Sequence, residues 1–343
     1  MTAMHPRTTS CAVALGAMLL AESAMAATVD SCKEIRPASA STQNMSIQAS
    51  GCYRLAERFD QHAIYSFALG GRMGSSGRAV IIANAPDVEL DLAGLSLSSN
   101  TGMSGVLSPH VKRGAEHRLV VENGSIELSD SDGNRSGPAV IAPEYEVQRV
   151  HALRNYSAVP STFEHVDYRL ENLHLHVGGI GVLLMGDGIV IRNCTIEVEG
   201  ENAIVIYGPH ALIENNRIVY RHNNANPTLI TATYPSAPGH YPQVPAAIYL
   251  RAADDAVVRG NTIEVKGQVA AAGIALVDSK NAHMEGNRFG GTDEPLRLVG
   301  TSAQVSFTDN VSLGGLLRAD KKLPDVVSDV AATAPIAAPA ASR

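Results

Sequence analysis

The chain has 343 residues, with 30 glycines, 17 prolines and no tryptophan, and a formal net charge of −7 at pH 7. Hydrophobic residues make up 45% and charged residues 18%, and this composition excludes a disordered chain, a collagen and a small disulfide-knotted protein. The acidic balance disfavours nucleic acid and an anionic membrane surface as partners.

The N-terminal segment has the features of an export signal. His5 and Arg7 precede an apolar run at 11–21, and Ala24-Met-Ala26 supplies a small-x-small cleavage pattern. Residues 1–26 are therefore predicted to be a cleaved signal peptide. The apolar run is too short to span a bilayer, so no membrane span is expected. A cleaved signal predicts a periplasmic or secreted protein, and we expect it to be a monomer.

Cysteine usage agrees with export. Cys32 and Cys52 lie 20 residues apart just after the signal, and in an oxidising compartment this pair predicts a disulfide. Closing a loop of that size contributes roughly 3 kcal/mol. Cys194 is then left over and is predicted to be a small buried core residue.

A six-residue pattern of the form apolar-x-(Asn/Gly)-x-x-apolar recurs along the chain. Most copies begin 21 to 29 residues apart, and two gaps are longer, at 49 and 45 residues. A period in this range predicts a stacked architecture. The copies begin at Leu92, Val121, Leu170, Ile191, Ile213, Val258 and Met284, and a degenerate last copy begins at Phe307.

A second apolar strand precedes most copies by a short turn. Each unit then reads as strand, turn, strand, turn in 21 to 26 residues, with alternating apolar positions and no helical stretch. The sequence therefore predicts an all-β fold, a parallel β-helix. These preceding strands are Gly181-Val-Leu-Leu184, Ala203-Ile-Val-Ile206, Ala247-Ile-Tyr-Leu250 and Gly273-Ile-Ala-Leu276.

Stacking of the copies predicts columns of like residues about 4.8 Å apart. A charged column alternates in sign only if Glu214 and Arg259 are neighbours, which makes the 45-residue gap one coil plus an insertion at 221–245. Two asparagine columns are expected to form structural ladders along the axis. They are Asn123, Asn172, Asn193 and Asn215, and then Asn216, Asn261, Asn287 and Asn310.

The repeat resembles that of the right-handed parallel β-helix, or pectin-lyase-like, superfamily, as does the opening Ser50-Gly-Cys-Tyr-Arg-Leu55. The resemblance covers about residues 50–315 and implies a substrate groove on the outside of stacked strands. No catalytic signature of an enzyme family in the group is present. The expected organisation is an N-terminal cap region at 27–50, the β-helix at 51–320, and a C-terminal cap with a low-complexity tail at 321–343.

One outward face of the predicted coils carries many titratable side chains. If the last apolar residue of each copy points inward, His176 and Glu197 share an outward column on adjacent coils. The carboxylate then orients the imidazole as a general base, and Arg217 or Arg221 meets the carboxylate of a uronate. His176, Glu197 and Arg217 are the predicted catalytic residues.

Further outward residues and the insertion supply the predicted substrate contacts. The insertion concentrates tyrosines and histidines that suit a wall for a sugar. The predicted substrate-binding residues are His174, Tyr220, Arg221, His222, Tyr234, Tyr241, Glu264 and Lys266.

Several functions stay open at this stage. The leading hypothesis is a lyase or epimerase acting on an acidic polysaccharide; the alternatives are a non-catalytic glycan-binding protein and a structural β-helix protein of the periplasm or cell surface. A hydrolase competes, since Glu197 and Glu264 share a column roughly 9–10 Å apart. Asp130 and Asp132 lack further oxygen ligands, so no metal site is predicted, and calcium stays open as a cofactor.

Overall fold

The computed structural model describes residues 32–36, 44–61, 79–109, 116–129, 136–142, 162–200, 202–222, 245–267, 271–313, 321–322 and 326–328. The chain divides into a unit that ends at Cys32 and a unit Lys33–Arg343, and every described strand belongs to the second. Within these ranges the regular secondary structure consists of β-strands alone, which confirms the all-β prediction.

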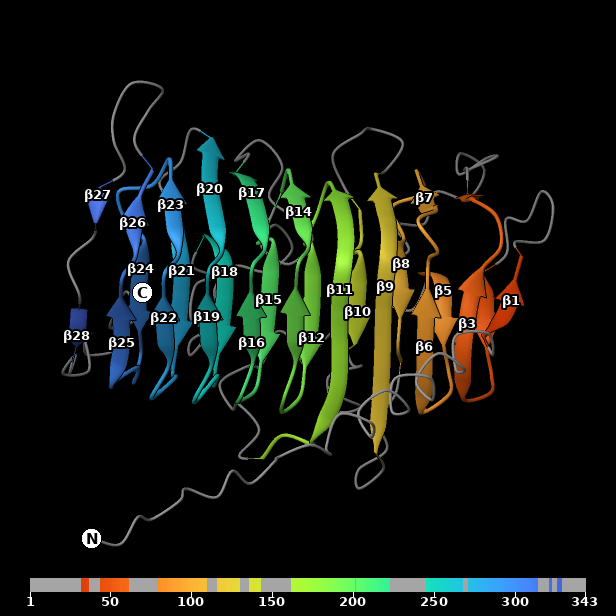
Figure 1. Ribbon diagram of the computed structural model, residues 1–343, viewed down its shortest axis with the longest axis horizontal. Coiled ribbons are helices and arrows are strands. Elements are labelled where there is room, and N and C mark those ends of the chain that lie inside the picture. The colour runs from red at the N-terminus through yellow and green to blue at the C-terminus, as the bar shows by residue number, and fades with distance from the viewer. Residues whose placement is uncertain are drawn as a thin grey trace, which may run out of the picture. The chain divides into compact units, whose positions relative to one another are not determined.

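One wall of the coils is a nine-stranded parallel sheet, here called sheet B. Its strands follow one another in chain order, one from each coil, among the residues described (Figure 1). They are β2 (Met45–Ile47), β5 (Ala79–Ala83), β8 (Ser104–Leu107), β10 (Val140–Ala142), β12 (Val182–Met185), β15 (Ile204–Tyr207), β18 (Ala246–Arg251), β21 (Ala272–Val277) and β24 (Leu296–Val299).

The other two walls belong to one 19-stranded sheet. Each coil bends partway along this sheet, and the bend divides the sheet into two faces. The first half is called the β13 face. It includes the first halves of the long strands β9 (His117–Leu128) and β11 (Val166–Val177). Its other strands are β1 (Lys33–Ile35), β3 (Gly51–Leu55), β6 (Asp87–Asp91), β13 (Val190–Arg192), β16 (Leu212–Glu214), β19 (Val257–Arg259), β22 (His283–Glu285) and β25 (Val305–Thr308).

The second half is called the β14 face. In Figure 1 it forms the upper row of arrows, and β9 and β11 run through both rows. Besides the second halves of β9 and β11, its strands are β4 (Phe59–Gln61), β7 (Ser96–Ser99), β14 (Thr195–Val198), β17 (Arg217–His222), β20 (Thr262–Gly267), β23 (Arg288–Gly290) and β26 (Val311–Ser312).

The bend between these faces corrects one expectation. The sequence pattern predicts two strands in each coil, whereas a complete coil has three, such as β12, β13 and β14. The six-residue repeat bends because its third residue is left-handed: φ is 57° at Asn123, 54° at Asn172, 55° at Asn193 and 56° at Asn215. At Asn193 and Asn215 the bend also ends one strand before the next begins, whereas β9 and β11 continue through it. Asparagine tolerates this conformation better than most residues, and the chain turns the corner there.

The strand register shows how many coils lie in the two long gaps of the repeat, those of 49 and 45 residues. Val121 pairs with Leu170 and Glu214 with Arg259, so each gap spans a single coil. The prediction of one coil plus an insertion is confirmed for the second gap. The insertion itself, apart from Arg221, His222 and Pro245, lies outside the described residues.

The interior is filled by rows of aliphatic side chains. On the β13 face Leu170, Ile191, Ile213, Val258 and Met284 stack in register, and each is 0% exposed. Burying a side chain of this size stabilises the fold by roughly 1.5–3 kcal/mol. Repetition of such rows explains how a core with few aromatic rings holds the stack together.

An internal asparagine ladder runs beside these rows, as predicted. The side-chain amides of Asn216, Asn261 and Asn287 each donate to Oδ1 of the next asparagine, at 3.0, 3.0 and 3.1 Å, ending at Asn310. At the other end the backbone N–H of Cys194 donates to Oδ1 of Asn216 at 2.9 Å. Cys194 is a free, buried cysteine, as expected.

The last coil is covered on two of its strands. β27 (Lys321–Lys322) pairs antiparallel with β26, and β28 (Val326–Ser328) pairs antiparallel with β25. All other pairings between described strands are parallel. These antiparallel strands end the parallel stack, as a terminal cap does in a stacked fold.

Candidate functional site

The outer surface of the β14 face carries the predicted site residues in the predicted register. His174 pairs with Thr195 and His176 with Glu197, while Val219 separates Glu197 from Glu264 in the same column. Because alternate residues of a strand point to opposite sides, these polar residues lie outside the coil. His174, His176, Glu197 and Glu264 are therefore close together on this surface.

Arg217 is held by two carboxylates. Its Nη1 lies 3.2 Å from Oε1 of Glu197, and its Nη2 lies 3.6 Å from Oε1 of Glu264. The residue between them, Val219, is 1% exposed although it points outward. The guanidinium therefore joins carboxylates on the coils before and after its own, and these carboxylates compete with a uronate for it.

Glu264 has a second cationic partner. Nζ of Lys266 lies 2.7 Å from its Oε2, and this hydrogen bond, with the charges of Lys266 and Arg217, lowers the pKa of Glu264 despite partial burial. A carboxyl with a lowered pKa is ionised at neutral pH and is poorly suited to donate a proton. The arrangement weighs against Glu264 as the acid of a hydrolase.

Of the remaining residues predicted to contact the substrate, one is exposed, one is buried and three cannot be placed on the surface. Arg221 is an exposed residue of β17, and its Nε lies 3.7 Å from Oε1 of Glu199. Tyr220 is 1% exposed and packs in the core, so it does not line the outer surface; parity along β17 alternates it with Arg221. The side chain of His222, and Tyr234 and Tyr241, lie outside the described residues.

A second titratable cluster lies in the turns between sheet B and the β13 face. Nδ1 of His210 lies 2.6 Å from Oδ1 of Asp187, and its Nε2 lies 3.9 Å from Oδ2 of Asp255. The hydrogen bond with Asp187, and then the nearby negative charges, raise the pKa of His210 despite some desolvation. The side chain is more than half exposed, so it has no enclosed site around it.

The turn column explains why His210 is there. Equivalent positions on successive coils are left-handed, at φ 95° for Gly188, 54° for His210, 57° for Asp255, 54° for Asn281 and 56° for Gln304. Glycine, histidine, aspartate and asparagine tolerate that conformation better than most residues, and Gln304 adopts it at the last described copy. The sequence already aligns part of this column, because Asp254-Asp255 occupies the turn equivalent to Gly208-Pro209-His210.

The outer side of sheet B is also buried, which alternation of apolar and polar positions does not predict. Val182–Met185 and Ile204–Tyr207 are apolar throughout, the pattern of strands covered on both faces. Arg251 is 4% exposed within this region, and its Nε lies 3.8 Å from Oδ2 of Asp278. Burial raises the pKa of Tyr249 to about 12.

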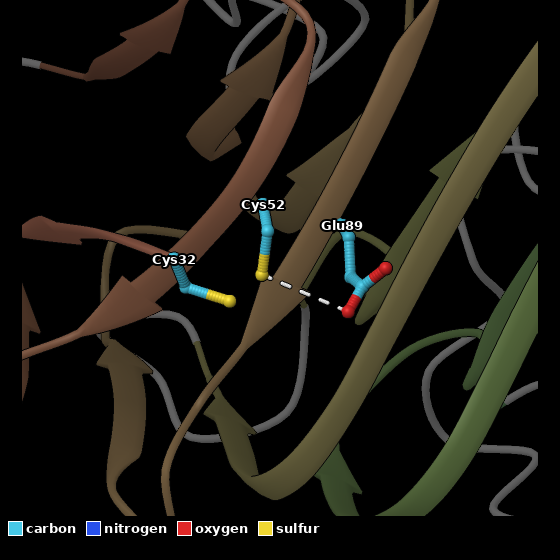
Figure 2. A group of neighbouring side chains, drawn as sticks. All are labelled: Cys32, Cys52 and Glu89. Atoms are coloured by element: carbon cyan, nitrogen blue, oxygen red, sulfur yellow. Dashed lines mark hydrogen bonds between the residues drawn. The ribbon is translucent and has the colours of Figure 1, made fainter. Parts of the chain in front are cut away.

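The predicted disulfide between Cys32 and Cys52 is confirmed. Figure 2 shows Cys52 beside Glu89 of the neighbouring strand β6, with Sγ and Oε1 3.6 Å apart. A bridged sulfur has no proton to donate, so this is a contact rather than a hydrogen bond. Nη2 of Arg118 lies 2.5 Å from the other oxygen of Glu89 and balances its charge.

No helix within the described residues is long and apolar enough to cross a membrane. Comparison with protein families matches residues 161–312 to the model of the right handed β-helix region. No curated protein and no solved structure matches the chain. The family match covers coils whose parallel pairing and bends are described above, so residues 161–312 form a right-handed β-helix region.

Proposed function

We propose that the protein binds an acidic polysaccharide along the outer surface of the β14 face. The observation that carries this proposal is the continuous polar surface formed by consecutive coils, with His174 and His176 on β11, Arg217 and Arg221 on β17, and Lys266 on β20. A stack of coils offers equivalent positions about every 4.8 Å. Extended surfaces of this kind suit extended ligands.

Charge argues for an acidic polymer at this face in particular. Arg221 and Lys266 are exposed register partners on adjacent strands. Among the described residues, Arg221 forms an ion pair with Glu199 at 3.7 Å and Lys266 forms one with Glu264 at 2.7 Å. Exposed pairs of this kind are worth little, roughly 0–1 kcal/mol, so a uronate carboxylate can replace Glu199 or Glu264 as a partner at small cost.

Lyase or epimerase chemistry is a second candidate, favoured by one observation. His176 lies in register between Glu127 and Glu197, which places carboxylates on both sides of a prospective base. Against it, Arg217 is already held by Glu197 and Glu264. Binding without turnover needs no rearrangement of that group and is therefore the first choice.

Export and a monomeric state belong to the same proposal. The signal-like segment 1–26 and the disulfide between Cys32 and Cys52 support an oxidising compartment outside the cytoplasm. Mass spectrometry of the protein secreted from its host tests cleavage after Ala26. Light scattering in solution tests the monomer.

Affinity electrophoresis with alginate, pectate and neutral glycans tests the binding proposal. We expect retardation by at least one uronan, and about tenfold weaker binding when Arg221 and Lys266 are both replaced by alanine. Lys280→Ala removes an exposed charge from a turn outside the face and serves as the control. Absence of binding to every polymer, or equal binding by the double variant, contradicts the proposal.

A lyase assay separates the second candidate. Elimination produces an unsaturated sugar whose ultraviolet absorbance is followed during incubation with the same uronans. If absorbance rises, His176→Ala should abolish it while His174→Ala retains part of it. A flat trace together with binding supports the non-catalytic proposal.

A further inference from the structure

A His-x-His pair lies on the outer surface of β11. His174 and His176 are two residues apart in one strand, so both imidazoles leave the same side of the β14 face, about 6.6 Å apart at the backbone. Both side chains are exposed. Two nitrogen donors therefore stand side by side on a rigid element of the fold.

A carboxylate lies beside this pair on each neighbouring strand. Glu127 of β9 and Glu197 of β14 are the register partners of His176. Glu197 is engaged by Arg217 at 3.2 Å. Glu127 is exposed, and no ion pair or hydrogen bond joins it, or either imidazole, to the part of the chain that the structure describes. Glu127 is thus the carboxylate that is free to turn toward the histidines.

We propose that His174, His176 and Glu127 form a binding site for Zn²⁺. Two imidazoles and one carboxylate are a donor set found in open zinc sites, where a water molecule takes the fourth position. Imidazole also suits copper and nickel ions. The inference does not depend on glycan binding, because it concerns the metal ion alone.

Forming the site requires rotation of side chains and no movement of the strands. The three ligand atoms do not all lie within 4.8 Å of one another, but the residues occupy adjacent positions on paired strands. Ser125 and Thr195 are the register partners of His174, and each carries a hydroxyl that can accept a hydrogen bond from the non-ligating nitrogen once the side chains have rotated. Such second-layer contacts orient a metal-binding imidazole.

Calorimetric titration of the full, disulfide-bonded chain with ZnCl₂ at pH 7.5 tests the site. We expect one ion per chain, at least tenfold weaker binding by His174→Ala, His176→Ala and Glu127→Gln, and none by the double histidine variant. His283→Ala removes an exposed histidine from the β13 face and is the matched control.

Two outcomes overturn the inference: no heat of binding by the parent protein, or equal affinity for the parent and the double histidine variant. Thermal unfolding of each metal-free variant separates loss of the ligand from loss of the fold. The tetrahedral absorption of bound Co²⁺, present in the parent and absent from the double variant, gives an independent readout.

Discussion

Arg259 donates from Nε and Nη2 to Oε2 of Glu214, at 2.9 and 2.6 Å, although the residues are 45 positions apart in the chain. They are register partners on β16 and β19, on either side of the insertion. Arg192 forms the same kind of pair with Glu171 at 2.8 Å on the preceding coils. The alternating column is thus real and continues across the insertion.

The pair between Glu214 and Arg259 should nevertheless add little stability. Because Arg259 is about half exposed, we expect a coupling energy of roughly 0.3–1 kcal/mol. Urea unfolding of Glu214→Ala, Arg259→Ala and the double variant measures it. Exchanging the two residues should recover most of the loss. A coupling above about 2 kcal/mol would mean that the column acts as a buried network.

The asparagine ladder should contribute much more. Asn261 is 0% exposed, and its amide also donates to the carbonyl of Ile213 at 2.9 Å. Asn261→Ala leaves several buried groups without partners, each costing about 1–3 kcal/mol, so we expect a loss of about 3 kcal/mol in urea unfolding. Asn172→Gly, at the exposed left-handed column, is the control and should change stability by less than about 0.5 kcal/mol. If both variants lost a similar free energy of unfolding, burial of the asparagine ladder would not explain its contribution.

Glu122 interrupts the alternating column. Its register partners are Asp91 and Glu171, so three carboxylates adjoin on consecutive strands. Partial burial and then the charges of Glu89, Asp91 and Glu171 raise the pKa of Glu122. Glu122→Gln should therefore stabilise the protein at pH 7, by about 1–3 °C in Tm.

The pH dependence follows from the direction of that shift. A carboxyl with a raised pKa contributes stability that is fully present below its unfolded pKa of about 4.3 and is lost as the pH rises through the folded pKa. The advantage of Glu122→Gln should therefore vanish below about pH 4. Melting curves between pH 3 and pH 8 measure this, and a constant difference at all pH values would contradict it.

Cys194 should be chemically inert in the folded protein. It is 2% exposed, and burial raises the pKa of its thiol to about 11, so little thiolate is present at neutral pH. With protein that begins at Ala27, a disulfide-exchange reagent should titrate no thiol in the native state. It should titrate one per chain in guanidinium without reductant. A rapid native reaction would place this thiol at the surface.

The sequence by itself determined the repeat, and with it the parallel stacking, the asparagine ladder and the neighbouring of Glu214 and Arg259. Consecutive copies of the repeat share the same spacing and the same residue types at equivalent positions, so aligning the copies predicts which residues stack. The disulfide between Cys32 and Cys52 was predictable for a similar reason, from the number and spacing of the cysteines.

Only the tertiary structure decided how each coil is folded and which site residues are available. The division into three walls depends on left-handed φ angles at Asn193 and its equivalents, which a period-two pattern does not reveal. Arg217 is held between Glu197 and Glu264, and Tyr220 is drawn into the core, because side-chain contacts form across coils and not along the chain. The availability of Glu127, His174 and His176 was decided in the same way, by which neighbours were already paired.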